Sequence, residues 1–172
     1  EWSTAQPQAA PQRAAMEAVF ASGRPSWGSC NGMQLAAVVL GGEVSESPNG
    51  VELGMATGIA LTDVGKTHPM MAGKATTYEA PCVHRDEVQS LPEGVQLVAG
   101  NVHSPVQAMV YQRGGVDFWG VQYHPECSVL DLAGWLQSRG PKLSDMVDDL
   151  KHAETDNDAA YRLGTTSAAL AI

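Results

Sequence analysis

The chain has 172 residues, of which 44% are hydrophobic and 17% charged, the composition of a globular domain large enough to bury a core. Its 19 acidic residues outnumber its 10 basic ones, and the formal net charge of -9 disfavours binding to nucleic acid. No apolar run approaches the roughly 20 residues that cross a bilayer, and no secretory signal is visible, so no membrane partner is expected. The three cysteines (Cys30, Cys82 and Cys127) form neither a disulfide framework nor a zinc pattern, and a reducing, cytoplasmic location is expected.

Helix-forming and strand-forming segments follow one another along the chain. Residues 8–22 predict a helix that ends at Gly23, residues 24–28 an extended segment leading into Cys30, and residues 32–40 a second, mostly buried helix. Val- and Thr-containing stretches punctuated by Gly and Pro predict strands at 51–62, 74–84, 95–102, 107–112 and 116–123, and helical periodicity returns at 129–138. This order predicts an α/β sheet sandwiched by helices.

The composition changes near the C-terminus. Between Pro141 and Ala160, six acidic residues face two basic ones. We interpret this segment as a solvated helical extension, with an interaction tail as the alternative. The predicted organisation is therefore a domain over residues 1–140 and an acidic helical extension over residues 141–172.

The segment 28–32 (GSCNG) joins the predicted strand to the predicted helix, with Cys30 at its centre. A nucleophile on a sharp strand-to-helix turn is exposed above the sheet, and glycines on both flanks allow strand and helix to pack closely. The start of the following helix favours a thiolate, and the backbone N–H of Asn31 would face an oxyanion. The alternative is a structural cysteine beside two turn glycines.

A second candidate segment ends the last predicted strand, at 120–126 (GVQYHPE). Residues i and i+2 of an extended backbone project to the same side, so His124 and Glu126 can address one site, and Pro125 should end strand pairing. A histidine oriented by a carboxylate is the base that an attacking thiol needs. The alternative is a strand-end histidine beside a solvated glutamate. The other histidines (His68, His84, His103 and His152) are not in such a pattern.

Three segments together resemble the class I glutamine amidotransferases. Residues 28–35 (GSCNGMQL) with the following LGG resemble the family's nucleophile motif, and residues 120–126 its His/Glu motif. Residues 83–88 (VHRDEV) are similar to the His-x-Asp segment of the branch related to the amidotransferase domain of GMP synthase. The resemblance implies a flavodoxin-like, three-layer α/β sandwich.

The resemblance also implies a reaction, the hydrolysis of the glutamine side-chain amide through a cysteine thioester without a cofactor or metal. Cys30 would be the nucleophile, His124 would protonate the departing ammonia, and Glu126 would hold the imidazole. The substrate-binding residues it implies are Asn31, Gln34, His84 and Asp86. For His84 the alternative is a cap on the next helix.

The sequence departs from the family in two places. The family has a Gly-rich loop upstream of the nucleophile that supplies an oxyanion N–H, and nothing before Gly28 matches it. We therefore expect a chain that starts at Glu1 without the domain's first strands and that is a poor glutaminase by itself. Asn31 also stands where the family more often has a bulky apolar residue, so the wall of the substrate site is expected to differ there.

The resemblance implies a synthetase subunit or domain as the partner that accepts ammonia, because no ATP-binding motif is present in this sequence. The identity of the acceptor is not readable. The same triad would also serve a γ-glutamyl hydrolase or a cysteine peptidase, and the fold could persist in an inactive binding domain. Ammonia release from free glutamine separates these alternatives.

Overall fold

The computed structural model describes residues 3–137, which fall into two units: the first ends at Pro125 and the second begins at Glu126. The extension predicted for residues 141–172 lies outside the described residues. Within residues 3–137, no helix is both long and apolar enough to cross a membrane.

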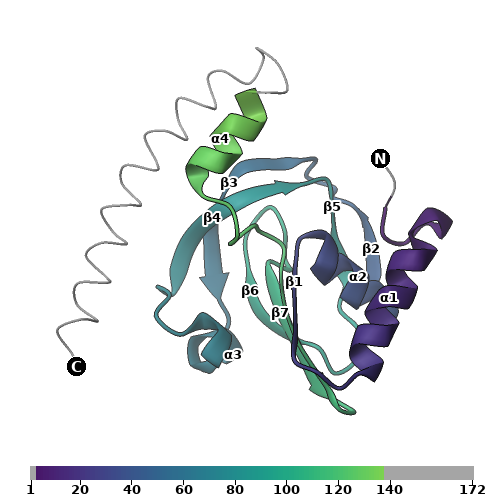
Figure 1. Cartoon of the computed structure of the whole chain (residues 1–172). Coiled ribbons are helices and arrows are strands. Elements are labelled where there is room, and N and C mark those ends of the chain that lie inside the picture. The colour runs from purple at the N-terminus through teal and green to yellow at the C-terminus, as the bar shows by residue number, and fades with distance from the viewer. Residues whose placement is uncertain (1–2, 138–172) are drawn as a thin grey trace. The chain divides into compact units, whose positions relative to one another are not determined.

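The first unit begins with helices and continues mainly with strands (Figure 1). A short 3-10 helix η1 (Pro7–Ala9) leads into α1 (Ala10–Ala21), and the predicted extended segment and second helix are present as β1 (Ser26–Ser29) and α2 (Asn31–Val39). The remaining elements of this unit are β2 (Glu43–Glu46), β3 (Glu52–Leu61), α3 (Asp63–Thr67), η2 (Pro69–Met71), β4 (Thr77–His84), β5 (Asp86–Ser90), β6 (Gln96–Gly100), β7 (Ala108–Arg113) and β8 (Val116–Val121).

The strands form a six-stranded sheet in the order β1-β8-β7-β6-β3-β4 and a separate antiparallel pair, β2-β5. Among the described strands, only β1 and β8 pair in parallel; the other neighbours in the large sheet are antiparallel. The predicted α/β fold and all of the predicted strands are confirmed. Four short elements were not predicted from the sequence: β2, β5, α3 and η2.

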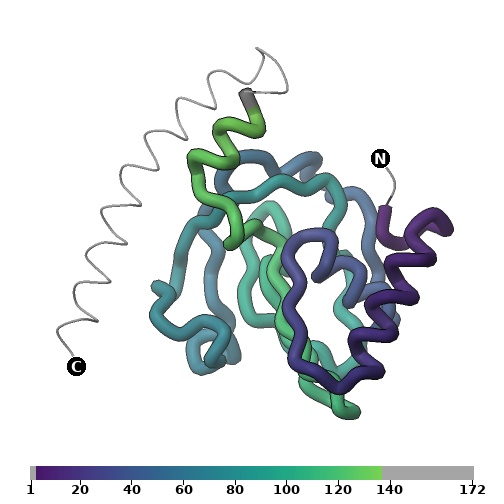
Figure 2. Tube along the Cα trace, in the orientation of Figure 1, coloured from purple at the N-terminus to yellow at the C-terminus, as the bar shows by residue number. Residues whose placement is uncertain are grey.

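Successive residues of a strand point to opposite sides, so the two faces of the large sheet pack against different parts of the chain. In β7, Met109 packs with Phe20 of α1 and Met33 of α2, whereas Val110 packs in a second cluster with Met71 of η2. Figures 1 and 2 show α1 beside α2, and α3 well apart from them, next to β3. The site described below lies where β1 passes into α2.

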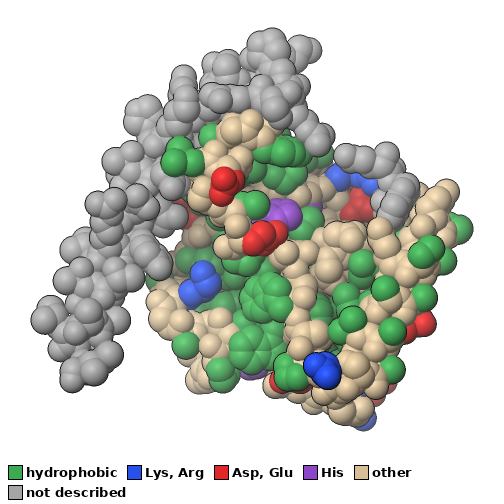
Figure 3. Space-filling view, in the orientation of Figure 1, with side chains coloured by type: hydrophobic (Ala, Val, Ile, Leu, Met, Phe, Trp, Pro, Cys, Tyr) green, Lys and Arg blue, Asp and Glu red, His purple; other side chains and the backbone are tan. Residues whose placement is uncertain are grey.

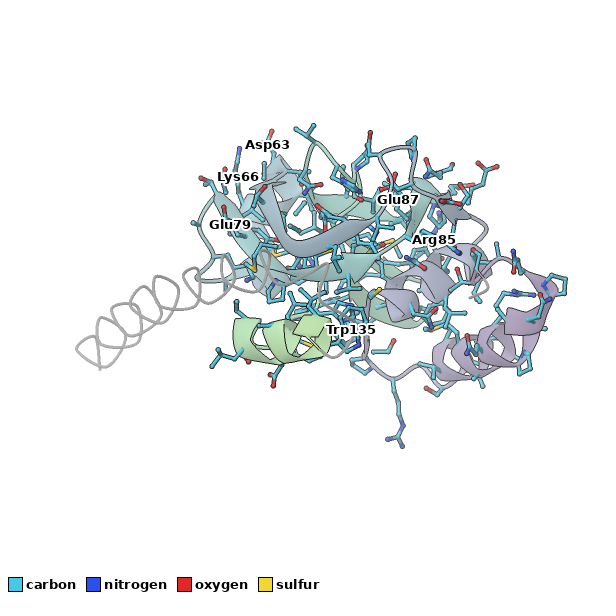
Figure 4. All side chains as sticks on the ribbon, turned by 90° about the horizontal axis from the view of Figure 1, so that it is seen from above. Asp63, Lys66, Glu79, Arg85, Glu87 and Trp135 are labelled. Atoms are coloured by element: carbon cyan, nitrogen blue, oxygen red, sulfur yellow. The ribbon has the colours of Figure 1, made fainter. Side chains whose placement is uncertain are left out.

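The surface of the first unit combines exposed charges with apolar area. Lys66 and Asp63 pair across one turn of α3, with 2.8 Å between Nζ and Oδ1 (Figure 4). On the face shown in Figure 3, hydrophobic side chains gather in the central region between α3 and β1. Trp27 of β1 is half exposed.

The described part of the second unit contains α4 (Val129–Gln137), within the helix predicted at 129–138. Ser128 and Asp131 cap its N-terminus reciprocally. The amide of Asp131 donates to Oγ of Ser128 at 3.1 Å, and the amide of Ser128 donates to Oδ2 of Asp131 at 3.0 Å. This exchange satisfies donors that the first helical turn cannot use internally.

Candidate active site

Cys30 occupies a strained turn between β1 and α2. Its φ of 46° and ψ of -106° make it the only non-glycine residue with positive φ among residues 3–137. The Cys30 amide donates to the carbonyl of Val121 at 2.8 Å, and the Cys30 carbonyl accepts from the amide of Gln34 at 3.1 Å. Such a conformation costs about 1–3 kcal/mol and persists only where its surroundings hold it, as they do at many active sites.

Glycine is required on one flank of this turn. A Cβ on Gly28 would lie 2.7 Å from the carbonyl carbon of Gly32 and 2.9 Å from the amide nitrogen of Met33, so strand and helix leave no room for it. A Cβ on Gly32 would meet nothing within 4 Å. The expectation that both flanking glycines are needed for close packing is therefore wrong for Gly32, which points away from the strand.

The Cys30 sulfur lies between one acceptor and one donor. Its Sγ is 3.6 Å from the carbonyl oxygen of Val83 and 3.6 Å from Nε2 of Gln122. The first N–H groups of an α-helix have no acceptor within the helix, so the start of α2 adds donors near this position. Asn31, which opens α2, is exposed; that its amide faces an oxyanion remains a prediction.

Gln34 and Asp86, two of the residues that the resemblance implies for substrate binding, are joined directly. Gln34 is buried in α2, and its Nε2 donates to the backbone carbonyl of Asp86 at 2.6 Å and to Oε1 of Gln122 at 3.3 Å. The Asp86 carboxylate pairs with Nε of Arg85 at 2.7 Å, at the junction of β4 and β5 where Figure 4 marks Arg85. Burial raises the pKa of Asp86, but hydrogen bonds from Arg85 and Ser3 outweigh burial and lower it.

His84 ends β4 and is buried. Its Nδ1 lies 3.0 Å from the backbone oxygen of Asp86, and its Nε2 lies 2.7 Å from Oε2 of Glu52. The alternative that His84 caps a following helix is wrong, because the next element is the strand β5. His84 thus has a carboxylate partner, which comes from the neighbouring strand β3 and not from its own segment.

Glu52 is the centre of a buried network that the sequence analysis missed. Its carboxylate accepts from Asn101 at 2.7 Å, from Gln107 at 2.8 Å and from the thiol of Cys82 at 3.5 Å, in addition to the contact with His84. Burial alone would raise the pKa of Glu52, but the hydrogen bonds from His84, Asn101 and Gln107, with the charge of His84, lower it to about 2. The register of β3 on β4, which places Glu52 opposite His84, creates this network.

The donor atoms of Glu52, Cys82 and His84 lie within 4.8 Å of one another, a spacing that a metal ion could bridge. Burial, followed by the charge and hydrogen bond of Glu52, raises the pKa of the Cys82 thiol far above its usual range. The thiol of Cys82 and the imidazole of His84 both lie against the Glu52 carboxylate, so the three side chains form one hydrogen-bonded network.

His124 is brought to the same edge of the sheet as Cys30. In the parallel pair, Ser29 lies opposite Val121, so the turn after β1 and the segment after β8 leave the sheet at their carboxyl ends, side by side. The amide of His124 donates to the carbonyl of Pro81 at 2.8 Å. Glu126 is the first residue of the second unit, and its pairing with His124 stays a prediction.

The family that matches this sequence is described as glutamine amidotransferase class-I, over residues 4–131. The chain therefore belongs to the class I glutamine amidotransferase family.

Two curated relatives illustrate the range within it. The chain is 41% identical over 140 residues to a gamma-glutamyl-L-1-hydroxyisopropylamide hydrolase from a Pseudomonas species, covering 78% of this chain and 47% of that protein. It is 33% identical over 112 residues to one of the subunits of glutamine-hydrolyzing GMP synthase from Sulfurisphaera tokodaii, covering 65% of this chain and 56% of that relative. The chain spans about half the length of these relatives.

The fold agrees with this assignment. A solved glutamine amidotransferase from Thermotoga maritima superimposes with a TM-score of 0.73 at 19% identity, over 96% of this chain and 73% of the other. At that identity the likeness establishes the fold alone. The fold implied by the resemblance, that of the class I glutamine amidotransferases, is confirmed.

The close approach at Gly28 predicts opposite effects for two neighbouring substitutions. Gly28→Ala forces a Cβ against backbone atoms that cannot move independently and should destabilise the protein by about 2–4 kcal/mol. Gly32→Ala adds a methyl group in open space within a helix and should be neutral or stabilise by up to about 1 kcal/mol. Denaturant unfolding measures both, and equal losses would contradict the packing described here.

The lowered pKa of Glu52 predicts a dependence of stability on pH. A carboxylate with a folded pKa of about 2 and an ordinary value of 4.5 stabilises the fold above pH 4.5, and this stabilisation is lost as the pH falls toward 2. Between pH 6 and pH 3, this residue should account for a loss of about 2 kcal/mol. Glu52→Gln should flatten the fall of unfolding free energy over that interval, whatever its effect at pH 7.

The matched control is Glu93→Gln, because Glu93 is exposed and pairs only at 3.5 Å with Arg113. It should leave the pH dependence as in the wild type. An unchanged slope in Glu52→Gln would show that Glu52 is not held ionised by the network.

Proposed function

We propose that Cys30 attacks the γ-carboxamide carbon of a glutamyl substrate, with free glutamine as that substrate. The observation that carries this proposal is the strained turn, which fixes a cysteine at φ 46° between a sheet strand and a helix N-terminus. Backbone strain of this kind clusters at functional sites, and a nucleophile on a strand-to-helix turn is one such case. Membership of the class I glutamine amidotransferase family supports the same substrate class.

The reaction divides into two steps. His124 takes the thiol proton of Cys30 as the sulfur forms a bond to the amide carbon, the carbon–nitrogen bond breaks, and His124 passes that proton to the departing nitrogen, which leaves as ammonia. Water then adds to the thioester with His124 as base, which releases glutamate and returns the thiol. Glu126 orients the imidazole, and Asn31, Gln34, His84 and Asp86 form the substrate-binding side of the site.

The released ammonia passes to an acceptor on a synthetase partner. Support for this part comes from the relatives that are GMP synthases, including one from Brucella melitensis at 34% identity over 115 residues. This chain covers 21% of that protein, so the acceptor chemistry would reside in sequence that the match does not include.

A second candidate function is hydrolysis of N-substituted γ-glutamyl amides. The observation that favours it is the 41% identity to the hydrolase from Pseudomonas, which exceeds the 33% identity to the GMP synthase relative from Sulfurisphaera tokodaii. The attacking atom and the thioester are the same in both reactions, and only the leaving group differs, ammonia in one and an alkylamine in the other. The choice of substrate therefore distinguishes the two functions, whereas a mutation of the triad should impair both.

Replacement of Cys30 tests the nucleophile in both. Cys30→Ala should lower turnover of glutamine and of γ-glutamyl isopropylamide to background in the full-length protein while the thermal unfolding midpoint changes little. Cys127→Ser is the control and should retain activity, because burial, followed by the charges of Glu126 and Asp131, raises the pKa of the Cys127 thiol. Ammonia release identifies the first function and amine release the second.

Labelling gives an answer that does not depend on turnover. A glutamine-mimicking electrophile should modify Cys30 faster than Cys82 or Cys127, as measured by peptide mass spectrometry. Faster modification of either other cysteine would overturn the assignment. Absence of both hydrolytic activities, with Cys30 unreactive, would identify a binding domain that retains the fold.

The roles of His124 and Glu126 predict a non-additive mutant cycle. His124→Ala should lower turnover far more than Glu126→Gln, which should slow the reaction and spare some activity because the base remains and only its orientation is lost. The double mutant should then resemble His124→Ala alone. Rate constants for the three variants measure the coupling, and fully additive losses would mean that the two residues act separately.

A further inference from the structure

Gln122 is used neither by the proposed triad nor by the implied substrate-binding residues. It is fully buried and immediately follows β8, two residues before His124. Its Nε2 faces the sulfur of Cys30 at 3.6 Å, and its Oε1 accepts from Gln34 at 3.3 Å. This side chain therefore connects the nucleophile to a residue of α2.

The direction of these hydrogen bonds is set by a backbone carbonyl. The oxygen of Asp86 can only accept, so the group of Gln34 that lies 2.6 Å from it must be the amide nitrogen. The second hydrogen on that nitrogen then points to Gln122, whose oxygen must receive it. The amide of Gln122 is thereby oriented with its nitrogen toward the sulfur. The Asp86 carbonyl thus sets the orientation of the Gln34 amide, and Gln34 sets that of the Gln122 amide, whose N–H faces the Cys30 sulfur.

The same carbonyl is shared with His84. Nδ1 of His84 lies 3.0 Å from the Asp86 oxygen and must carry a hydrogen there, while Nε2 lies against the Glu52 carboxylate. Asp86 is thus held in place by the buried network around Glu52 on one side and by Gln34 on the other. The orientation of Gln122 consequently rests on groups that the core immobilises.

We propose that Gln122 is a positioning residue for the nucleophile, whose amide N–H holds the Cys30 sulfur and favours its thiolate form. In the resting state the thiol hydrogen is directed to the carbonyl of Val83, at 3.6 Å from the sulfur. When that proton leaves, the Val83 oxygen repels the sulfur, and the Gln122 amide stabilises the negative charge together with the donors at the start of α2. The catalytic role of this contact rests on the proposed function, but its effect on the charge of the Cys30 sulfur does not.

The pH dependence of Cys30 alkylation tests this directly. Iodoacetamide reacts with the thiolate, and mass spectrometry of the Cys30 peptide gives the rate at each pH in the full-length protein. Gln122→Met keeps the side-chain volume but removes the donor, so the midpoint of the profile should move up by about one pH unit. At pH 7 the rate should fall about tenfold. Gln122→Glu keeps an oxygen for Gln34 but faces the sulfur with a carboxylate, and its midpoint should move further.

Gln107 provides a matched control. It is equally buried, and its backbone carbonyl accepts from the amide of Gln122 at 2.9 Å, but its Nε2 donates to Glu52. Gln107→Met should leave the midpoint within a few tenths of a pH unit of the wild type even if it lowers thermal stability. A Gln122→Met profile that superimposes on the wild type, or an equal shift in Gln107→Met, would overturn the inference.

Turnover separates the inference from the function on which it rests. If the Gln122 variants shift the alkylation midpoint but the wild type hydrolyses neither glutamine nor a γ-glutamyl amide, the proposed function fails and the positioning role stands. If the wild type is active and both variants leave the alkylation profile unchanged, the positioning role fails and the function stands. Far-ultraviolet circular dichroism confirms that each variant compared is folded.

Discussion

The parallel pairing of β1 with β8 is the constraint on which the candidate site depends. The ladder does not stop at the end of β1: the amide of Cys30 continues it by bonding to Val121 at 2.8 Å. That bond fixes one side of a turn whose backbone conformation is unfavourable by itself, and the first turn of α2 fixes the other. Close packing adds to the constraint, because a Cβ on Gly120 would lie 2.8 Å from the Met33 side chain.

Buried polar groups make the surroundings of this turn rigid. A carboxylate taken out of water costs several kcal/mol unless donors surround it, and Glu52 is surrounded by donors from three segments of the chain. The Asp86 carbonyl accepts twice, from His84 and Gln34. The second of these acceptors joins the buried network to the site, because the Asp86 carbonyl holds the Gln34 amide that in turn bonds to Gln122.

The spacing of residues along the chain predicted most of the helices and strands, but it did not predict which strands pair or in which register. The helices at 8–22 and 32–40 and the longer strands were predicted because their apolar spacing is a property of contiguous residues. The strands β2 and β5 were missed because they are short and polar, and they become strands by pairing with each other. Glu52 was missed for a related reason: its proximity to His84 depends on how β3 pairs with β4.

The candidate site shows the same division. The turn at Cys30 was predicted because a nucleophile between a strand and a helix carries its own local pattern, but the different roles of Gly28 and Gly32 depend on which backbone each faces. The alternative for His84, a cap on the next helix, was wrong because the chain after it extends along β2. Gln122 lies within a predicted strand end, yet only the packing of α2 against β8 gives its amide a partner.

The three cysteines lie in different electrostatic surroundings. Cys82 lies in the sheet with its sulfur against the Glu52 carboxylate, and Cys127 lies near Glu126 and Asp131; in both, burial and negative charge raise the pKa of the thiol. Cys30 instead faces an amide donor at the N-terminal end of a helix, where the fixed dipoles favour negative charge. Because a thiolate is both the nucleophile and the charged species, the groups that lie around the sulfur decide which cysteine can react. The proposed assignment of Cys30 as the nucleophile therefore depends on the same helix start and strand pairing that create the turn.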